Sequence, residues 1–234
     1  MAKHDHRRVI AIDGPAAAGK TTVAKELADS LGILLFDTGS LYRSVTLRSL
    51  RKGADLNDEQ AIAKQAKKAK IKLKAPSIED GRSADVMLDG EDVTWAIRQP
   101  DVDANVSKVA AYPTVREALL EVQRENADGS AVVMVGRDIG TVVTPDAGTK
   151  IYLDATVEER ARRRYQDMRR QGEDMDYISV LEELRERDFK DSTRATAPLR
   201  VADDAIHIKT DGLDVEDIVG QIEKIVREQW ASIA

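Results

Sequence analysis

A glycine-rich loop early in the chain carries the residue types that bind the phosphates of a nucleoside triphosphate. Gly14 and Gly19 allow the tight turn that places backbone N–H groups around an anion. The helix that follows points the positive end of its dipole at the same anion. Lys20 supplies charge to the β- and γ-phosphates, the Thr21 hydroxyl is an expected Mg²⁺ ligand, and Thr22 can bond the α-phosphate. The loop reads Gly14-Pro15-Ala16-Ala17-Ala18-Gly19-Lys20-Thr21.

This pattern predicts a P-loop, which by itself does not distinguish a kinase from a GTPase or a motor ATPase. A GTPase normally carries a guanine-selective Asn-Lys-x-Asp run, which the sequence lacks, and a motor ATPase is usually larger than 234 residues. Arginines recur at the starts of loops and helices, which suits phosphoryl transfer to a small acceptor. A kinase for a small acceptor, such as a nucleotide or shikimate, and a nucleotide-binding regulator without turnover are the alternatives.

Short apolar strands alternate with helical segments, which predicts a doubly wound, parallel, five-stranded sheet with helices on both faces. The continuous apolar run Ala131–Val135 is typical of a strand buried on both faces. The other expected strands are Val9–Ile12, Leu34–Phe36, Ile151–Leu153 and Ala205–Ile208. The expected helices are Lys20–Leu31, Ser40–Arg51, Asp103–Ala111, Pro113–Asn126, Glu158–Gln171, Tyr177–Phe189 and Val215–Trp230.

The alternation breaks after Gly53, where a lysine-rich helix capped by Asn57 or Asp58 runs to Lys70. Short β segments follow, and Asp89-Gly90 between two of them is a hairpin signal. We therefore expect a single domain, 1–234, with a small antiparallel insertion at about 70–100. Its core is expected at about 7–69 and 101–234.

Composition favours a soluble globular protein, with 42% hydrophobic and 33% charged residues. A net charge of −6 argues against nucleic-acid binding, and no cysteine is present to form disulfides or thiolate metal sites. His4, His6 and His207 are too few and too scattered for a zinc site, and the first two lie in an expected frayed terminus. The sequence lacks a long apolar span and the apolar core of a signal peptide. We expect a cytoplasmic enzyme that binds neither membrane nor nucleic acid.

Five sequence blocks in order resemble the bacterial cytidylate kinases, and the resemblance extends from about Val9 to Trp230. It implies transfer of the γ-phosphoryl group of ATP to CMP or dCMP with Mg²⁺. It further implies a monomeric nucleoside monophosphate kinase core, an inserted acceptor-binding subdomain and a mobile arginine-rich lid at about 158–174. The blocks are Ile10–Thr21, Asp37–Arg43, Ser107–Glu117, Gly136–Val143 and Arg187–Arg194.

Candidate acceptor residues follow the second strand, where ligands bind in parallel sheets. The guanidinium fork of Arg43 can hold an acceptor phosphate bidentately. The alternatives are a solvated helix charge for Arg43 and a core position for Tyr42. The resemblance assigns Thr38, Tyr42 and Arg43 to the acceptor.

Arg137 and Asp138 follow the strand Ala131–Val135 and reach the same sheet edge. Arg137 can clamp phosphate, while the Asp138 carboxylate can accept a hydrogen bond from the cytosine amine and would repel the uracil carbonyl oxygen. The resemblance places Asp138, Arg116 and Ser107 on the base. A surface charge and a helix cap are the alternatives for Arg116 and Ser107.

Arginines in the last third of the chain complete the expected site. By resemblance Arg187 and Asp191 contact the ribose, and Arg194 lies near the transferring phosphate; an ordinary surface ion pair is the alternative. The run Arg160-Ala-Arg162-Arg163-Arg164 is the expected lid, which closes over ATP and excludes water. The expected catalytic residues are Lys20, Arg137, Arg194, Arg160, Arg163 and Arg164.

No general base is needed, because a phosphate oxygen is already ionised near neutral pH. The expected Mg²⁺ ligands, partly through water, are Thr21 and Asp37, whereas Asp13 is expected to brace the loop. Many members of the resembling family carry an acidic residue where this chain has Val135. If that carboxylate helps to hold Mg²⁺-bound water in the family, this role must fall to Asp37 or be absent here.

Overall fold

A computed structural model describes residues 5–129, 131–170, 172 and 174–232 of the chain. His4, the predicted helix end at Gln171, and Glu173 within the expected lid lie outside the described residues.

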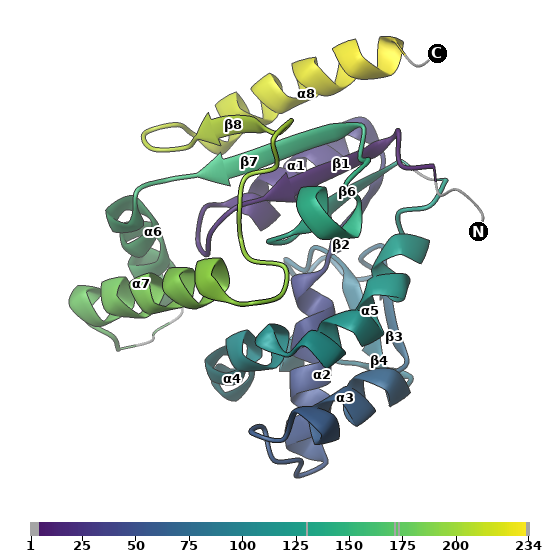
Figure 1. Cartoon of the computed structure of the whole chain (residues 1–234). Helices are drawn as coiled ribbons and strands as arrows, with labels where there is room; N and C mark the ends of the chain where they lie inside the picture. The colour runs from purple at the N-terminus through teal and green to yellow at the C-terminus, as the bar shows by residue number, and fades with distance from the viewer. Residues whose placement is uncertain (1–4, 130, 171, 173, 233–234) are drawn as a thin grey trace.

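The predicted parallel sheet is confirmed, with strand order β2-β6-β1-β7-β8 and parallel pairing throughout (Figure 1). Successive residues of β1 face opposite layers, as the two-residue period of a strand requires. Ile10 and Ile12 pack toward α1 (Lys20–Leu31) and α8 (Val215–Ala231). Val9 and Ala11 instead join the cluster that contains α2 (Gly39–Arg51) and α5 (Pro113–Glu125). The strands are β1 (Val9–Asp13), β2 (Leu34–Asp37), β6 (Val132–Val135), β7 (Thr149–Asp154) and β8 (Ile206–Lys209).

Helices cover both faces of this sheet, which makes the fold doubly wound (Figure 1). A separate pair, α6 and α7, packs against itself and against Ala16 of the P-loop through the buried residues Ala161, Met168 and Leu184. The helices that cover the sheet are α1 (Lys20–Leu31), α2 (Gly39–Arg51), α5 (Pro113–Glu125) and α8 (Val215–Ala231), and the separate pair is α6 (Val157–Arg170) and α7 (Tyr177–Thr193).

The predicted antiparallel region is also confirmed, as the three-stranded sheet β3-β4-β5. Asp89 and Gly90 have φ angles of 52° and 96°, the left-handed pair that a tight hairpin needs. Val86 and Leu88 of this sheet pack on Leu47 of α2. The elements here are α3 (Glu59–Lys68), β3 (Ile71–Lys74), β4 (Asp85–Leu88), β5 (Glu91–Asp92), a 3₁₀ turn (Ala96–Arg98) and α4 (Pro100–Ala111).

One predicted helix start was wrong, and one open alternative is resolved. Helix α4 begins at Pro100 rather than Asp103, because proline is tolerated in the first turn. Of the two predicted caps of α3, Asp58 is confirmed, and its side chain accepts from the backbone N–H groups of Gln60 and Ala61. The π-helical turn Ile139–Val143 was not predicted. His6 is not frayed but buried, with Nδ1 2.6 Å from Asp146 Oδ1.

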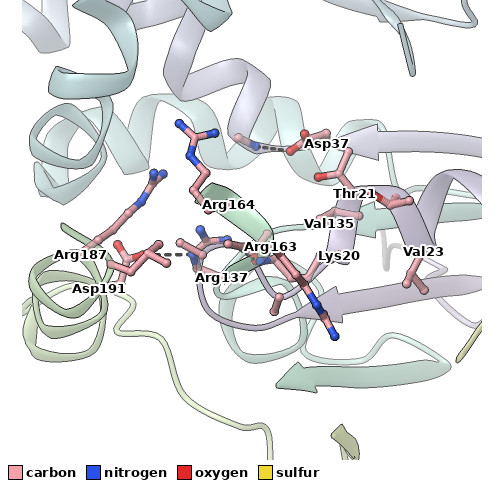
Figure 2. A pocket seen from close by; sticks show the side chains of 18 of the residues that line it. Lys20, Thr21, Val23, Asp37, Val135, Arg137, Arg163, Arg164, Arg187 and Asp191 are labelled. Carbon is pink, nitrogen blue, oxygen red and sulfur yellow. Dashed lines mark hydrogen bonds and ion pairs between the residues drawn. The ribbon is translucent and has the colours of Figure 1, made fainter. Parts of the chain in front are cut away.

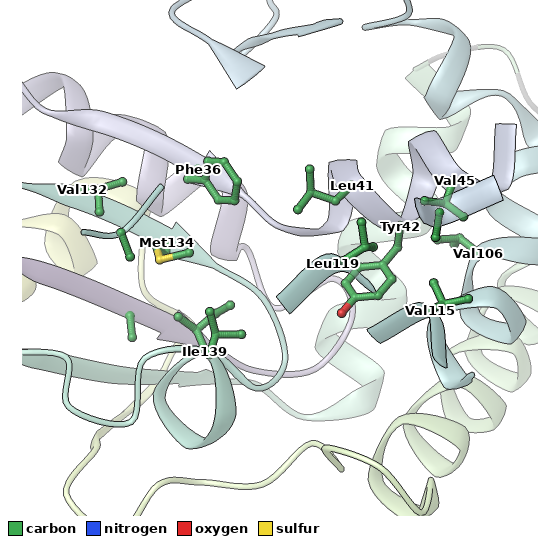
Figure 3. Close-up of a cluster of buried hydrophobic side chains, with 14 of the residues drawn as sticks. Phe36, Leu41, Tyr42, Val45, Val106, Val115, Leu119, Val132, Met134 and Ile139 are labelled. Carbon is green, nitrogen blue, oxygen red and sulfur yellow. The ribbon is translucent and has the colours of Figure 1, made fainter. Parts of the chain in front are cut away.

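A buried cluster joins the sheet to the helices α2 and α5. Phe36 and Met134 lie on the sheet, Tyr42 on α2 and Leu119 on α5, and Figure 3 shows the Tyr42 ring next to Leu119. The cluster ties the ends of β2 and β6 to α2, so the residues that follow these strands are held in place.

In the part of the chain that the structure describes, no helix has the length and apolarity to cross a membrane.

We expect Gly14→Ala to destabilise the fold by about 2 kcal/mol or more, as overpacking does. Gly14 has φ +149°, and a Cβ atom there would lie 2.0 Å from the Leu153 carbonyl oxygen. Gly220→Ala is the matched control, since a Cβ atom there meets nothing within 4 Å; it should stabilise α8 by about 0.5 to 1 kcal/mol. Urea unfolding checks both, and equal stabilities for the two variants would contradict the close approach.

Candidate active site

A cavity of about 720 Å³ lies at the carboxyl ends of the sheet strands, between the P-loop, the helices α2, α4 and α5, and the pair α6–α7 (Figure 2). Its size suits a pair of small ligands. The lining includes ten lysine and arginine side chains and six aspartates. The cavity is therefore built for polyanionic ligands. The cationic side chains are Lys20, Arg43, Arg98, Arg116, Arg137, Arg163, Arg164, Arg170, Arg187 and Arg194.

The P-loop forms the floor of this cavity from Ala16 to Thr22, with Gly14 and Pro15 behind the lining. Ala17 adopts φ 59°, a strained conformation of the kind that functional loops retain. The buried Lys20 ammonium donates to the Pro15 carbonyl oxygen at 2.6 Å. Burial, reinforced by the charge of Arg137, lowers the pKa of Lys20 well below its usual range. A phosphate group beside Lys20 would relieve both effects.

Asp13, at the end of β1, braces the loop after β6 rather than the P-loop. Its two carboxylate oxygens accept from the backbone N–H groups of Ile139 at 2.9 Å and Gly140 at 2.8 Å. Burial raises the pKa of Asp13 to about 6, although these two hydrogen bonds favour the charged form. Asp13 thereby fixes the turn that follows Arg137 and Asp138.

Residues that follow β2 form one wall of the cavity. The Thr38 hydroxyl donates to the Val135 carbonyl oxygen at 2.8 Å. Tyr42 belongs to the buried cluster and also lines the cavity. A core position and a place in the cavity wall are therefore compatible for this residue. The Arg43 guanidinium donates to the Ile97 carbonyl oxygen at 3.2 Å and to the Asp103 carboxylate at 2.5 Å.

The two candidate base-reading residues form a buried ion pair. Arg116 Nη2 donates to Asp138 Oδ2, and Arg116 Nη1 donates to the Ala110 carbonyl oxygen at 3.0 Å. The Arg116 guanidinium also lies over the Tyr42 ring, 5.2 Å from its centroid. Arg116 is therefore not a surface charge. Ser107 lies one helical turn from Ala110 and lines the same part of the cavity.

Two arginines contact Asp191 on α7. Arg137 Nε donates to Asp191 Oδ2 at 3.0 Å (Figure 2), and Arg194 Nη1 lies 3.7 Å from Asp191 Oδ1. Among the described residues, the buried Arg187 Nε and Arg194 Nη2 have no hydrogen-bond partner, although Arg194 Nη2 lies 3.6 Å from Asp138 Oδ1. Burial, together with the charge of Arg137, lowers the pKa of Arg187 to about 10. These unpaired donors and crowded charges fit an anionic ligand in the cavity.

The expected lid arginines separate into two kinds. Arg163 and Arg164 line the cavity, and Arg163 donates to the Thr210 carbonyl oxygen at 2.6 Å. Arg160 lies outside the lining. Its guanidinium donates to the carbonyl oxygens of Ala155 and Ala16, at 2.9 and 3.1 Å, and to the Asp188 carboxylate at 2.6 Å.

The donor set around Thr21 and Asp37 fits Mg²⁺. Both residues line the cavity, and the Asp37 carboxylate is oriented by the Gly39 N–H at 2.9 Å. Among the described residues, no three His, Cys, Asp or Glu side chains converge on one point. Mg²⁺ typically takes one or two protein oxygens and completes its shell with water and substrate phosphates. Val135 pairs in register with Asp37, so the departure noted above sits directly beside this carboxylate.

Sequence reasoning missed several side chains of the cavity wall, among them Arg98 and Asp103. Asp103 is one of two acids in the first turn of α4, where acids commonly complement the helix dipole, so its sequence context carried no sign of a site. Arg98 lies in a 3₁₀ turn that the sequence did not reveal.

A model of the cytidylate kinase family matches residues 10–228, so the chain belongs to that family. The cytidylate kinase of Caldanaerobacter subterraneus subsp. tengcongensis is 48% identical over 94% of each chain. That of Herpetosiphon aurantiacus is 49% identical over 89% of this chain and 90% of its own. A shikimate kinase from Acinetobacter baumannii, solved with shikimate, has 19% identity and a TM-score of 0.46, covering 94% of this chain and 93% of its own. A likeness that weak carries no argument about the acceptor.

We expect Arg160→Ala to destabilise the protein by about 2 to 4 kcal/mol, because it leaves Asp188 and the Ala16 carbonyl without their partner. Arg162→Ala, an exposed neighbour on the same helix, should change stability by less than about 0.5 kcal/mol. Urea unfolding measures both. Similar effects from the two substitutions would contradict the bracing role of Arg160.

Asp13 should make the protein less stable as the pH rises from 4 to 6. Its folded pKa, about 6, lies above the usual value, so the folded state keeps a proton that the unfolded chain has lost. The stability of the parent protein relative to Asp13→Asn should fall by about 2 to 3 kcal/mol over this interval. Urea titrations at each pH test this, with the exposed Asp203→Asn as control. A flat difference between parent and Asp13→Asn would contradict the raised pKa.

Proposed function

We propose that this protein transfers the γ-phosphoryl group of ATP to CMP or dCMP, giving ADP and CDP or dCDP. One observation carries the proposal. The buried pair Arg116–Asp138 faces the same cavity as the P-loop and the phosphate-binding arginines. The base of a nucleotide acceptor can therefore bind at this pair while its phosphate meets Arg43 and Arg137, next to the ATP phosphates at Lys20. Membership of the cytidylate kinase family supports the same assignment.

The chemistry is positioning and charge stabilisation. The acceptor oxygen is already ionised, so no residue has to remove a proton. Lys20 and the backbone of Ala16 to Thr21 hold the ATP phosphates, and Arg43, Arg137 and Arg194 hold the acceptor phosphate in line with them. Arg163 and Arg164 neutralise the transferring group and exclude water when the lid closes.

Base selection rests on Asp138 and Arg116. One Asp138 oxygen accepts from Arg116, and the other lies 3.6 Å from Arg194. Asp138 can accept from the cytosine amine, and Arg116 can donate to the ring nitrogen and carbonyl, with Ser107 at the same wall. Uracil would present an oxygen to the carboxylate, and a buried mismatch of this kind discriminates strongly. Arg187 and Asp191 hold the ribose.

Mg²⁺ would be held by Thr21 and, through water, by Asp37, where it screens the ATP phosphates. The chain works as one kinase unit, with the acceptor-binding insertion at about 70–100 and the lid at about 158–174. We further propose that it acts as a cytoplasmic monomer in pyrimidine nucleotide metabolism and binds no nucleic acid or membrane.

The direct test is ADP release from ATP·Mg²⁺ with CMP, dCMP, UMP, AMP, GMP, dTMP, shikimate or no acceptor. We expect strong turnover with CMP and dCMP and weak turnover with UMP. Lys20→Ala should abolish it. Asp138→Ala should lower kcat/KM for CMP by about 100-fold and for UMP much less, as expected for a lost buried hydrogen bond to the base.

Turnover with a different acceptor and none with CMP would contradict the CMP assignment but would leave the assignment as a kinase intact. Failure with every acceptor would favour a nucleotide-binding regulator. Equal losses for CMP and UMP in Asp138→Ala would contradict the base-reading role.

A further inference from the structure

Asp103 links the two sides of the cavity mouth. It lies in the first turn of α4, on the acceptor side, and each of its carboxylate oxygens meets a different arginine. Oδ1 accepts from Arg43 Nη2 at 2.5 Å, and Oδ2 accepts from Arg164 Nη2 at 3.2 Å. Arg43 belongs to α2 and Arg164 to α6, so one aspartate joins the acceptor-side helices to the lid helix.

Both arginines are among those expected to meet phosphate. Both line the cavity, as does Asp103 itself. Burial raises the pKa of Asp103, but the charges of Arg43, Arg164 and Arg187 outweigh this and hold the pKa below its usual range. The carboxylate is therefore ionised at neutral pH and supplies the negative charge that a phosphate would otherwise bring.

A carboxylate and a phosphate cannot use the same guanidinium N–H groups. A phosphate monoester carries more charge and three acceptor oxygens, so it competes strongly for an arginine fork. Its approach also brings it close to the Asp103 carboxylate, which has the same sign of charge. Binding of the acceptor phosphate at Arg43 therefore works against the contact between Arg43 and Asp103.

We propose that Asp103 is an internal substitute for the acceptor phosphate, which holds Arg43 and Arg164 before CMP binds and releases them when it does. It thereby sets the affinity for the acceptor and makes release of the lid depend on acceptor binding. The proposal rests on the assigned CMP kinase function. Asp103 is a positioning residue in this scheme, since it acts through the two arginines and not on the reacting atoms.

The first test compares Asp103→Asn with Asp101→Asn, a control in the same helical turn whose carboxylate accepts only from the adjacent Val102 N–H among the described contacts. We expect Asp103→Asn to lower KM for CMP by about 3- to 10-fold, the range that one or two partly screened ion pairs support. kcat should change by less than about 2-fold, because chemistry is left to other residues. Binding of cytidine, which has no phosphate, should be unchanged in calorimetry.

The second test follows the lid directly. The chain contains no cysteine, so Ala111→Cys on α4 and Arg169→Cys on α6, both exposed, can carry a pair of spin labels. In the parent background, CMP should shift and broaden the distance distribution between the labels. In the Asp103→Asn background, the protein without ligand should already show the broad distribution.

An unchanged or higher KM for CMP in Asp103→Asn would overturn the proposal, as would an equal gain in cytidine affinity. A label distribution that Asp103→Asn leaves narrow would also overturn it. Failure of the parent protein to phosphorylate CMP would instead contradict the assigned function, so the two failures are distinguishable.

Discussion

Repulsion between like charges is the constraint on which this structure depends. Ten cationic side chains share one cavity, and without anions among them the cavity would be strongly destabilising. Aspartates placed between the arginines reduce this repulsion. Asp191 lies between Arg137 and Arg194, and Asp138 meets Arg116. The remaining imbalance is visible in Lys20 and Arg187, whose pKa values are both lowered by burial and by a neighbouring cation.

The sheet determines where these charges meet. Residues that follow β1, β2 and β6 reach one edge because parallel strands end together, and the register pairs Asp37 with Val135 and Ile12 with Val135. The helices α6 and α7 bring a second set of arginines from later in the chain. Their small core is separate from the two clusters on the sheet faces. If α6 and α7 act as the proposed lid, this separate core allows them to change position with little effect on the packing of the sheet.

Sequence reasoning predicted what local patterns encode. The P-loop, the five parallel strands and the Asp89-Gly90 turn each follow from a few adjacent residues. The roles assigned to individual side chains stay predictions, although most of those side chains line the cavity. Contacts between distant segments could not be predicted in this way. The bond from Arg160 to the Ala16 carbonyl joins positions 144 residues apart, and the arginine run alone did not separate this residue from Arg163 and Arg164.

The anchoring of Arg160 has a mechanical consequence for α6. Arg160 lies near the beginning of the helix, and its bond to the P-loop backbone fixes that end to the nucleotide floor. A rotation of the helix then pivots about Arg160, and displacement grows with distance from this point. Arg163 and Arg164 sit about one turn from this point and Arg170 lies at the far end, so Arg170 would be displaced furthest if α6 moved as the proposed lid. Such a motion would open the cavity at the end of the helix away from the P-loop and leave the end at Arg160 in place.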